Sequence, residues 1–257
     1  MHLDVRRQGA VRSTAVMFAI GIGEDGQREI LGVETALSET EQGWYRFIQK
    51  LKERGLSGVE VATSDAHSGL KQALRESFPG LIWQRCQAHF KRNVLDQTPV
   101  SYKDRMDQVL DQLLRAASQQ EAQDRLSDLR EELMEDAPSA LEVLEDGVLE
   151  DGFFEATAVL VLPGKYRRRL RTTNMVERFI QEIRRREKVV RIFPNQESVY
   201  RLVGALCAET HEEWSTGRCY FDMEEFFRGV FQVEGLLLRG RLSRRPGLID
   251  GELSRPR

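Results

Sequence analysis

The sequence has little cysteine, no long apolar stretch and no secretion signal. Its three cysteines, Cys86, Cys207 and Cys219, are too few and too scattered for a disulfide framework. No apolar run approaches the roughly 18 residues that a membrane helix needs. Residues 1–4 lead directly into a charged segment instead of a signal peptide. We therefore expect a reduced, cytoplasmic protein that has no membrane partner.

Signatures of two large enzyme classes are also missing. The sequence has no glycine-rich loop of the Walker type, which disfavours an ATP-driven enzyme, and no Gly-x-Ser-x-Gly elbow, which disfavours acyl chemistry. Hydrophobic residues make up 40% and charged residues 31% of the chain, a composition typical of a globular protein. The 257 residues suffice for one sizeable domain or for a core domain with an insertion.

The formal net charge of −3 hides an uneven distribution. Residues 121–155 include 13 acidic and 2 basic side chains, whereas residues 165–191 include 11 basic and 3 acidic ones. We interpret the acidic block as a solvated surface. For the basic strip a solvated face is the alternative, but contact with DNA phosphates is favoured because the strip brackets Glu177. The candidate DNA-binding residues are Lys165, Arg167, Arg168, Arg169, Arg171, Arg178, Arg184, Arg185 and Arg186.

Apolar periodicity predicts alternating strands and helices in the first part of the chain. A helix is expected over 40–54, where the apolar side chains fall on one face, and another follows Asp65. Strands are expected at 3–5, 14–22, 29–36, 59–63 and 81–83. This pattern alone indicates an α/β protein, and its order is that of a ribonuclease-H-like fold, in which helices flank a mixed sheet.

Helical spacing dominates from residue 94 to about residue 170, which predicts an α-helical insertion. Thr172 or Thr173 is the candidate N-cap of the following helix, which carries Glu177. The predicted organisation is a first part of the ribonuclease-H-like core at 1–95, the insertion at 96–170, the remainder of the core at 171–235 and a disordered tail at 236–257.

Carboxylates far apart in the sequence can meet at one edge of such a sheet. Phosphoryl transfer on DNA commonly uses two Mg²⁺ ions about 3.5–4 Å apart, and hard oxygen ligands hold them. Asp4 on the first strand and Asp65 at the end of the fourth are expected to be neighbours, with Glu177 on a helix facing them. Taken singly, each is one of 41 acidic residues, for which a surface role is more common.

The combined motifs are more specific, and they resemble those of Mutator-like transposases of bacterial insertion sequences. In the family's order they are residues 64–71, 83–90 with 92–94, 173–178, 192–195 and 211–214. By this resemblance Asp4, Asp65 and Glu177 are the catalytic, metal-binding carboxylates of a DDE transposase. The helical segment between Asp65 and Glu177 resembles the family's insertion.

The resemblance also implies a function. It implies transposition of an insertion sequence by metal-dependent DNA strand cleavage and strand transfer, using two Mg²⁺ or Mn²⁺ ions. The implied partners are the element ends, the target DNA and further copies in a homodimer or higher oligomer, at the bacterial nucleoid. Family members carry a long N-terminal region where only three residues precede Asp4, so a truncated chain is expected. The alternatives are another nuclease or recombinase of this fold, and an inactive remnant that binds DNA or a full-length partner.

Further candidates lie close to these carboxylates in the sequence. Cys86 and His89 form the family's Cys-x-x-His motif. With Cys207 and His211 they can be arranged as a zinc site, although a buried cysteine or a neighbour of the catalytic site is the favoured interpretation. His67 either orients a metal ligand or contacts a phosphate, or it caps a helix or makes local hydrogen bonds.

Overall fold

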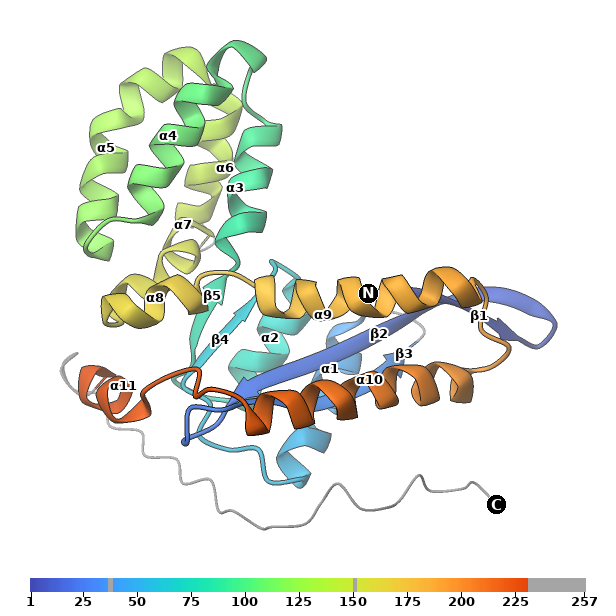
Figure 1. The fold of residues 1–257 in the computed structure, drawn as a ribbon. Coiled ribbons are helices and arrows are strands. Elements are labelled where there is room, and N and C mark those ends of the chain that lie inside the picture. Colours follow the sequence, from blue (N-terminus) through green and yellow to red (C-terminus); the bar gives the residue numbers. More distant parts are fainter. Residues whose placement is uncertain (37–38, 150–151, 231–257) are drawn as a thin grey trace.

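The computed structural model describes residues 1–36, 39–149 and 152–230 as a mixed α/β structure (Figure 1). The strands are β1 (His2–Arg7), β2 (Ala10–Ile22), β3 (Arg28–Ala36), β4 (Val61–Ser64) and β5 (Ile82–Arg85). The first three form an antiparallel sheet in the order β1-β2-β3, and β4 and β5 form a parallel pair.

Helices make up most of the rest. They are α1 (Glu41–Glu53), α2 (Ser68–Ser77), α3 (Gln87–Asp96), α4 (Lys103–Leu114), α5 (Gln119–Asp136), α6 (Pro138–Leu149), α7 (Gly152–Ala156), α8 (Gly164–Leu170), α9 (Asn174–Val190), α10 (Gln196–Thr216) and α11 (Met223–Val230). Two 3-10 helices, η1 (Val100–Tyr102) and η2 (Ala158–Val161), complete the list. Within the described ranges, no helix has the length and apolar character needed to cross a membrane.

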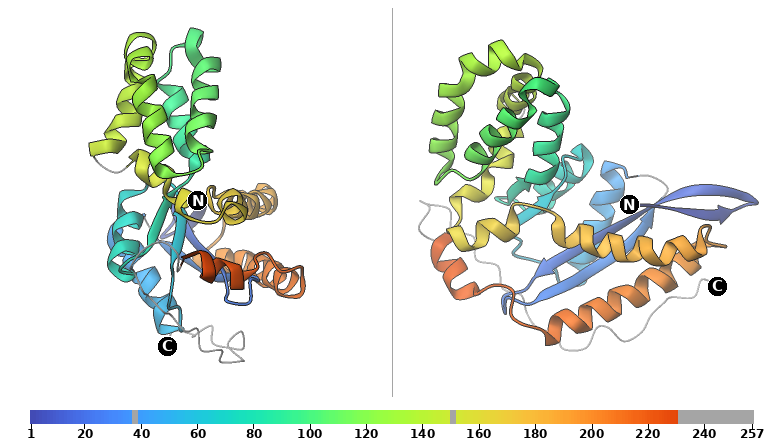
Figure 2. Two further views of the ribbon diagram at one scale, coloured as in Figure 1. Left: turned by 90° about the vertical axis from the view of Figure 1, so that its left-hand side faces the viewer. Right: turned by 45° about the horizontal axis from the view of Figure 1, so that its top comes forward.

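Helices cover both faces of the antiparallel sheet. The pair α1 and α2 lies on one face, and α9 and α10 lie on the other (Figures 1 and 2). Successive side chains of a strand point to opposite faces, and β2 follows this rule: Val16 packs with the cluster under α9 and α10, whereas Met17 packs with α1 and α2. The strand is therefore buried on both sides.

The insertion is a separate helical body that stands on the end of the sheets (Figure 1). Its core joins side chains from α3 to η2, among them the fully buried Leu110, Leu113 and Phe153. Helix α3 contributes Phe90 and Val94 to this core. The packing of the insertion therefore begins before the predicted boundary at residue 96.

Two glutamines of the motif at residues 83–90 attach the insertion to the parallel strands. The buried side-chain amides of Gln84 and Gln87 both donate to the carbonyl oxygen of Ala156, at 2.9 and 2.8 Å. The carbonyl oxygen of the Gln84 side chain accepts from the backbone nitrogen of Val159 at 2.8 Å. Because a buried amide is costly to leave unpaired, these glutamines fix the place where the chain returns from the insertion.

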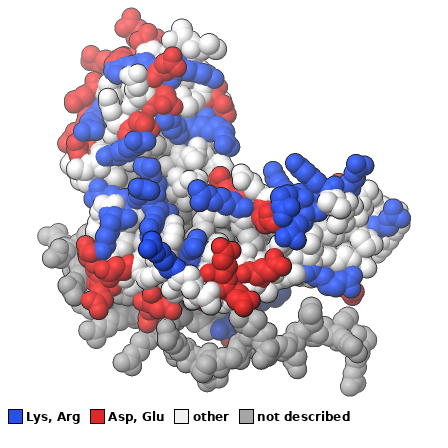
Figure 3. All heavy atoms as spheres, viewed as in Figure 1, with Lys and Arg blue, Asp and Glu red and all other residues white. Residues whose placement is uncertain are grey.

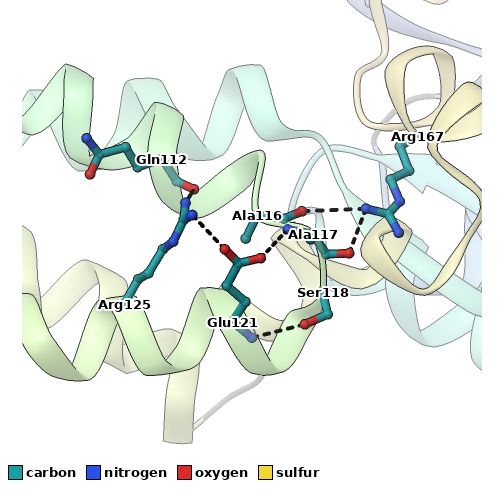
Figure 4. Close-up of polar contacts among 7 residues, drawn as sticks. All are labelled: Gln112, Ala116, Ala117, Ser118, Glu121, Arg125 and Arg167. Carbon is teal, nitrogen blue, oxygen red and sulfur yellow. Dashed lines mark hydrogen bonds and ion pairs between the residues drawn. The ribbon is translucent and has the colours of Figure 1, made fainter.

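Arg167 of α8 makes a second attachment. Its guanidinium donates to the carbonyl oxygens of Ala117 at 2.9 Å and Ala116 at 3.5 Å, just beyond α4 (Figure 4). The next helix begins there with Ser118, whose hydroxyl accepts from the backbone nitrogen of Glu121 at 3.1 Å. A cation beside the carbonyls at a helix C-terminus is favourable, so Arg167 holds the turn between α4 and α5.

Local elements follow the expectations from sequence more closely than strand pairing does. The strands predicted at 3–5, 14–22, 29–36, 59–63 and 81–83 correspond to β1 to β5, and the helix predicted over 40–54 corresponds to α1. The expected contact between the first and fourth strands is wrong: among the described strands, β1 pairs only with β2 and β4 only with β5. The tail predicted to be disordered lies outside the described residues.

Candidate active site

Asp65 and Cys86 leave neighbouring strands at the same edge of the parallel pair. Ser64 and Arg85 are register partners at the ends of β4 and β5. The backbone nitrogen of Cys86 donates to the carbonyl oxygen of Ser64 at 2.7 Å, so the pairing continues one step past the strands. Asp65 is exposed, whereas Cys86 is fully buried. The carboxylate and the thiol therefore start from adjacent points of the fold but face different environments.

His67 caps helix α2. Its Nδ1 accepts from the backbone nitrogen of Leu70 at 3.3 Å, and its ring packs edge-to-face on Trp44 with 6.3 Å between centroids. Capping satisfies one of the N–H groups that a helix leaves unpaired at its start. Of the roles considered for His67, the structure shows helix capping.

The start of α9 is held against the start of α3. The backbone nitrogen of Gln87 donates to the carbonyl oxygen of Arg171 at 2.9 Å. Two residues later, Thr173 donates its backbone N–H to the sulfur of Cys86 at 3.4 Å. These contacts join the segment before α9 to the N-terminus of α3, which brings the first turns of the two helices together.

Glu177 lies in the first turn of α9, where a helix favours negative charge. Its Oε1 accepts a hydrogen bond of 2.9 Å from the hydroxyl of Thr173 and lies 3.8 Å from Nε2 of His89. The Thr173 oxygen is also 3.3 Å from the sulfur of Cys86. A hydroxyl has one hydrogen, so when Thr173 donates to Glu177 its oxygen can accept from the Cys86 thiol. Thr173 thereby fixes the side chain of Glu177.

The structure brings together one candidate ligand atom each from Cys86, His89 and Glu177, all within 4.8 Å of one another. In the part of the chain that the structure describes, this is the one such group of three or more. Cys207 and His211 are not part of it. Cys207 packs beside α9 and α10 instead, and burial raises the pKa of its thiol to about 11. The structure therefore does not assemble the zinc site predicted from Cys86 and His89 together with Cys207 and His211.

A cavity of about 500 Å³ opens beside this cluster. Asp65, His89, Thr173 and Glu177 line it, together with residues 16–23 of β2 and its turn and residues 57–64 along β4. Asp65 and Glu177, which are 177 − 65 = 112 positions apart in the sequence, thus face the same space.

Asp4 lies elsewhere. Leu3 and Val5 point into the core beneath α9 and α10, so Asp4 between them is on the exposed face of β1. Its carbonyl oxygen accepts from the backbone nitrogen of Phe193 at 2.8 Å, beyond the C-terminus of α9. Near that end, burial raises the pKa of Glu187, and Asp4 adds to the effect. A rise of about 1.5 Å per residue puts Glu187 roughly 15 Å along the helix from Glu177.

The predicted DNA-binding residues divide into three groups. Several make contacts within the protein: Arg167 as described, Lys165 with Asp222 and Glu225, Arg169 over the ring of Tyr220, and Arg185 and Arg186 with Glu182. Arg171 is partly buried, and this burial lowers the pKa of its guanidinium. Arg168, Arg178 and Arg184 are exposed. Figure 3 shows Lys and Arg gathered over α8 and α9, while the far end of the insertion carries many acidic groups.

Sequence reasoning missed the part that Thr173 plays. The sequence offered Thr172 or Thr173 as the helix N-cap, and the structure places Thr173 there, but its hydroxyl contacts Glu177 and Cys86 instead of a backbone N–H. The signal was its position four residues before Glu177, since such residues lie on one face of a helix.

Comparison with known proteins agrees with the motifs. Residues 1–217 match the family model described as Transposase, Mutator family. The chain is 39% identical over 214 residues to the transposase for insertion sequence element IS256 in transposon Tn4001 of Staphylococcus aureus, covering 83% of this chain and 54% of that protein. It is 42% identical over 222 residues to the transposase for ISRM5 of Rhizobium meliloti, covering 86% and 54%.

A third relative is the transposase for IS1081 of Mycobacterium tuberculosis, which is 34% identical over 226 residues, covering 88% of this chain and 53% of that protein. The chain spans about half the length of the curated relatives it matches. The match to the family model covers residues 1–217 and includes the whole cluster around Glu177. The chain belongs to the Mutator family of transposases.

Proposed function

We propose that this chain is the catalytic part of a DDE transposase that cleaves and joins DNA strands at the ends of an insertion sequence. The observation that carries the proposal is the shared cavity of Asp65 and Glu177. The three relatives described above are transposases for insertion sequences, which supports the same class of reaction. The proposal includes a ribonuclease-H-like fold, in which the antiparallel strands and the parallel pair belong to one mixed sheet.

The residues present fit Mg²⁺ or Mn²⁺. Asp65 offers an exposed carboxylate at the cavity wall, and Glu177 offers a second one that is 41% exposed. Both polar contacts that the structure shows for Glu177, from Thr173 and His89, are to Oε1, and Glu177 lines the cavity. Asp65 and Glu177 would hold these ions, which would supply activation of the attacking oxygen and stabilisation of the leaving oxygen of a phosphodiester.

The protein's own residues position these groups. Thr173 holds Glu177 through its hydroxyl, and the backbone contact between Gln87 and Arg171 holds the start of α9 near β5. The exposed Arg168, Arg178 and Arg184 supply charge for phosphate contact along α8 and α9. These contacts give affinity for the DNA backbone without choice of sequence.

The test pairs metal binding with DNA cleavage. Asp65→Asn and Glu177→Gln should each weaken Mn²⁺ binding, measured by calorimetry, and lower Mn²⁺-dependent nicking of plasmid DNA by more than about 100-fold, since even residues that only orient metal ligands contribute 10- to 100-fold. Glu182→Gln, on the same helix, is the matched control and should retain both. Retention of nicking by Glu177→Gln would overturn the proposal.

Asp4 is tested in the same assays. As the third carboxylate it is a prediction from sequence, and its place near the far end of α9 favours unchanged Mn²⁺ binding in Asp4→Asn. Of the three predicted catalytic carboxylates, Asp65 and Glu177 line the cavity and Asp4 does not, so an inactive remnant that binds DNA is the second candidate function. If the unaltered chain binds Mn²⁺ and DNA but does not nick DNA, the inactive remnant is the function that the data support.

A further inference from the structure

The cluster beside Glu177 has a donor set that the proposed function does not use. Mg²⁺ prefers oxygen ligands, but here a sulfur, a ring nitrogen and a carboxylate oxygen, from Cys86, His89 and Glu177, lie within 4.8 Å of one another. Mixed sulfur, nitrogen and oxygen ligands are the choice of Zn²⁺ and related transition metals. The cluster therefore differs in chemistry from the carboxylate pair, with which it shares Glu177.

The backbone already places these ligands at short range. Cys86 precedes α3 and His89 lies in its first turn, and residues three apart share one face of a helix. Bond lengths of about 2.0–2.3 Å to Zn²⁺ imply separations of roughly 3.3–3.6 Å between tetrahedral ligand atoms. The distance of 3.8 Å between Nε2 of His89 and Oε1 of Glu177 is close to that value. The other two pairs of ligand atoms also lie within 4.8 Å, so each needs to approach by at most about 1.5 Å to reach tetrahedral spacing.

Thr173 holds the cluster together when no ion bridges it. Its hydroxyl oxygen lies 3.3 Å from the sulfur of Cys86 and 2.9 Å from Oε1 of Glu177. Its backbone N–H also points at the sulfur, at 3.4 Å. The sulfur is therefore held by two polar contacts from Thr173 and is not merely packed as an apolar group.

We propose that Cys86, His89 and Glu177 form a three-ligand site for Zn²⁺ or a similar transition-metal ion, with the fourth position open toward the cavity. Binding exchanges the thiol proton of Cys86 for the ion, so one proton is released and one metal–sulfur bond forms. The ion also engages Glu177. A consequence that rests on the proposed function is that Zn²⁺ inhibits the Mg²⁺-dependent reaction by withdrawing Glu177 from Asp65.

Co²⁺ is the probe, because a thiolate bound to Co²⁺ gives a charge-transfer band in the near ultraviolet and tetrahedral Co²⁺ gives intense visible bands. The unaltered chain should bind one Co²⁺ with both features, release one proton and lose the bands on addition of Zn²⁺. Cys86→Ser should remove the charge-transfer band, and His89→Ala and Glu177→Gln should each weaken Co²⁺ binding at least about tenfold. Circular dichroism checks that each variant remains folded.

Cys207→Ser and Cys219→Ser are matched controls, and both should retain the bands. Asp65→Asn separates this proposal from the proposed function: it should lose Mn²⁺-dependent nicking yet retain the Co²⁺ bands. The transition-metal site is refuted if no charge-transfer band forms, if the band survives in Cys86→Ser, or if it depends on Cys219. These three refuting outcomes are read from the Co²⁺ spectra alone and require neither DNA nor an active enzyme.

Discussion

The helical insertion and the sheet-bearing part are built from contacts of different range. The core of the insertion takes its side chains from one stretch, residues 90–160. The cluster beneath α9 instead combines Leu3 with Phe193 and Val203, from opposite ends of the described chain. Contacts between distant segments require the closure of long loops. The difference teaches that the core of the insertion rests on contacts within one stretch of sequence, whereas α9, which carries Glu177, packs on segments that are distant in the sequence.

The largest effects should come from the two cores. Leu113 in the insertion and Ile183 on α9 are both fully buried, so Leu113→Ala and Ile183→Ala should each lower the free energy of unfolding by about 2–5 kcal/mol. Only Ile183→Ala should also weaken Co²⁺ binding, because α9 carries Glu177. Urea denaturation and cobalt titration measure the two effects.

Val189→Ala is the control for these variants, since its side chain is 86% exposed, and it should change stability by less than about 0.5 kcal/mol. If Leu113→Ala weakened Co²⁺ binding as strongly as Ile183→Ala, the core of the insertion would also support the metal site. That result would contradict the contrast between local packing in the insertion and long-range packing around α9.

An intermediate effect is expected for DNA binding, which should depend on α8 and α9 and not on the insertion. Arg168→Ala should make the log–log dependence of DNA affinity on salt shallower by about 0.9, the value for one lost phosphate contact. Arg130→Ala, in the insertion, should leave the slope unchanged, because Arg130 pairs with Glu145. Fluorescence anisotropy with a labelled duplex at several salt concentrations measures the slope.

Arg167→Ala supplies the contrast on the same helix. Its guanidinium holds the carbonyl oxygens of Ala116 and Ala117, so this variant should lose stability while keeping the salt slope. Equal slopes for Arg167→Ala and Arg168→Ala, both shallower than that of the unaltered chain, would mean that the contacts in the structure do not separate the two arginines.

The smallest effect is a pH dependence within the insertion. Hydrogen bonds from Arg105 and Tyr102 lower the pKa of Glu132 to about 2 from its usual value of 4.5. A lowered folded-state pKa adds stability above the unfolded value, and this stability is lost as pH falls from about 4.5 toward 2. Because the pair is partly exposed, the contribution should stay below about 1 kcal/mol.

Glu132→Gln should therefore flatten the acid side of the stability profile, measured by urea denaturation between about pH 6 and pH 3. Glu142→Gln, at an exposed position of α6, is the charge-matched control. An unchanged profile in Glu132→Gln would show that Arg105 and Tyr102 do not hold this carboxylate in solution.

The sequence predicted what local patterns determine. Apolar spacing located the strands and helices of the first 95 residues, and motif order pointed to Asp65 and Glu177, which the structure places on one cavity. It did not predict the position of Asp4, because strand pairing depends on hydrogen bonds between distant segments that no local pattern records. The carbonyl contacts of Arg167 were missed for the same reason: a basic residue in a basic strip carries no sign of its partner.

The cavity between β2 and β4 has a consequence for association. The pairing of β1 along β2 ends with the hydrogen bonds between Met1 and Val16. Beyond that point β2 lines the cavity, as does β4, which pairs only with β5 among the described strands. Backbone N–H and C=O groups on such edges need water or another strand as partners. An extended segment laid along both edges would join the two sheets into one and seal the wall behind Asp65.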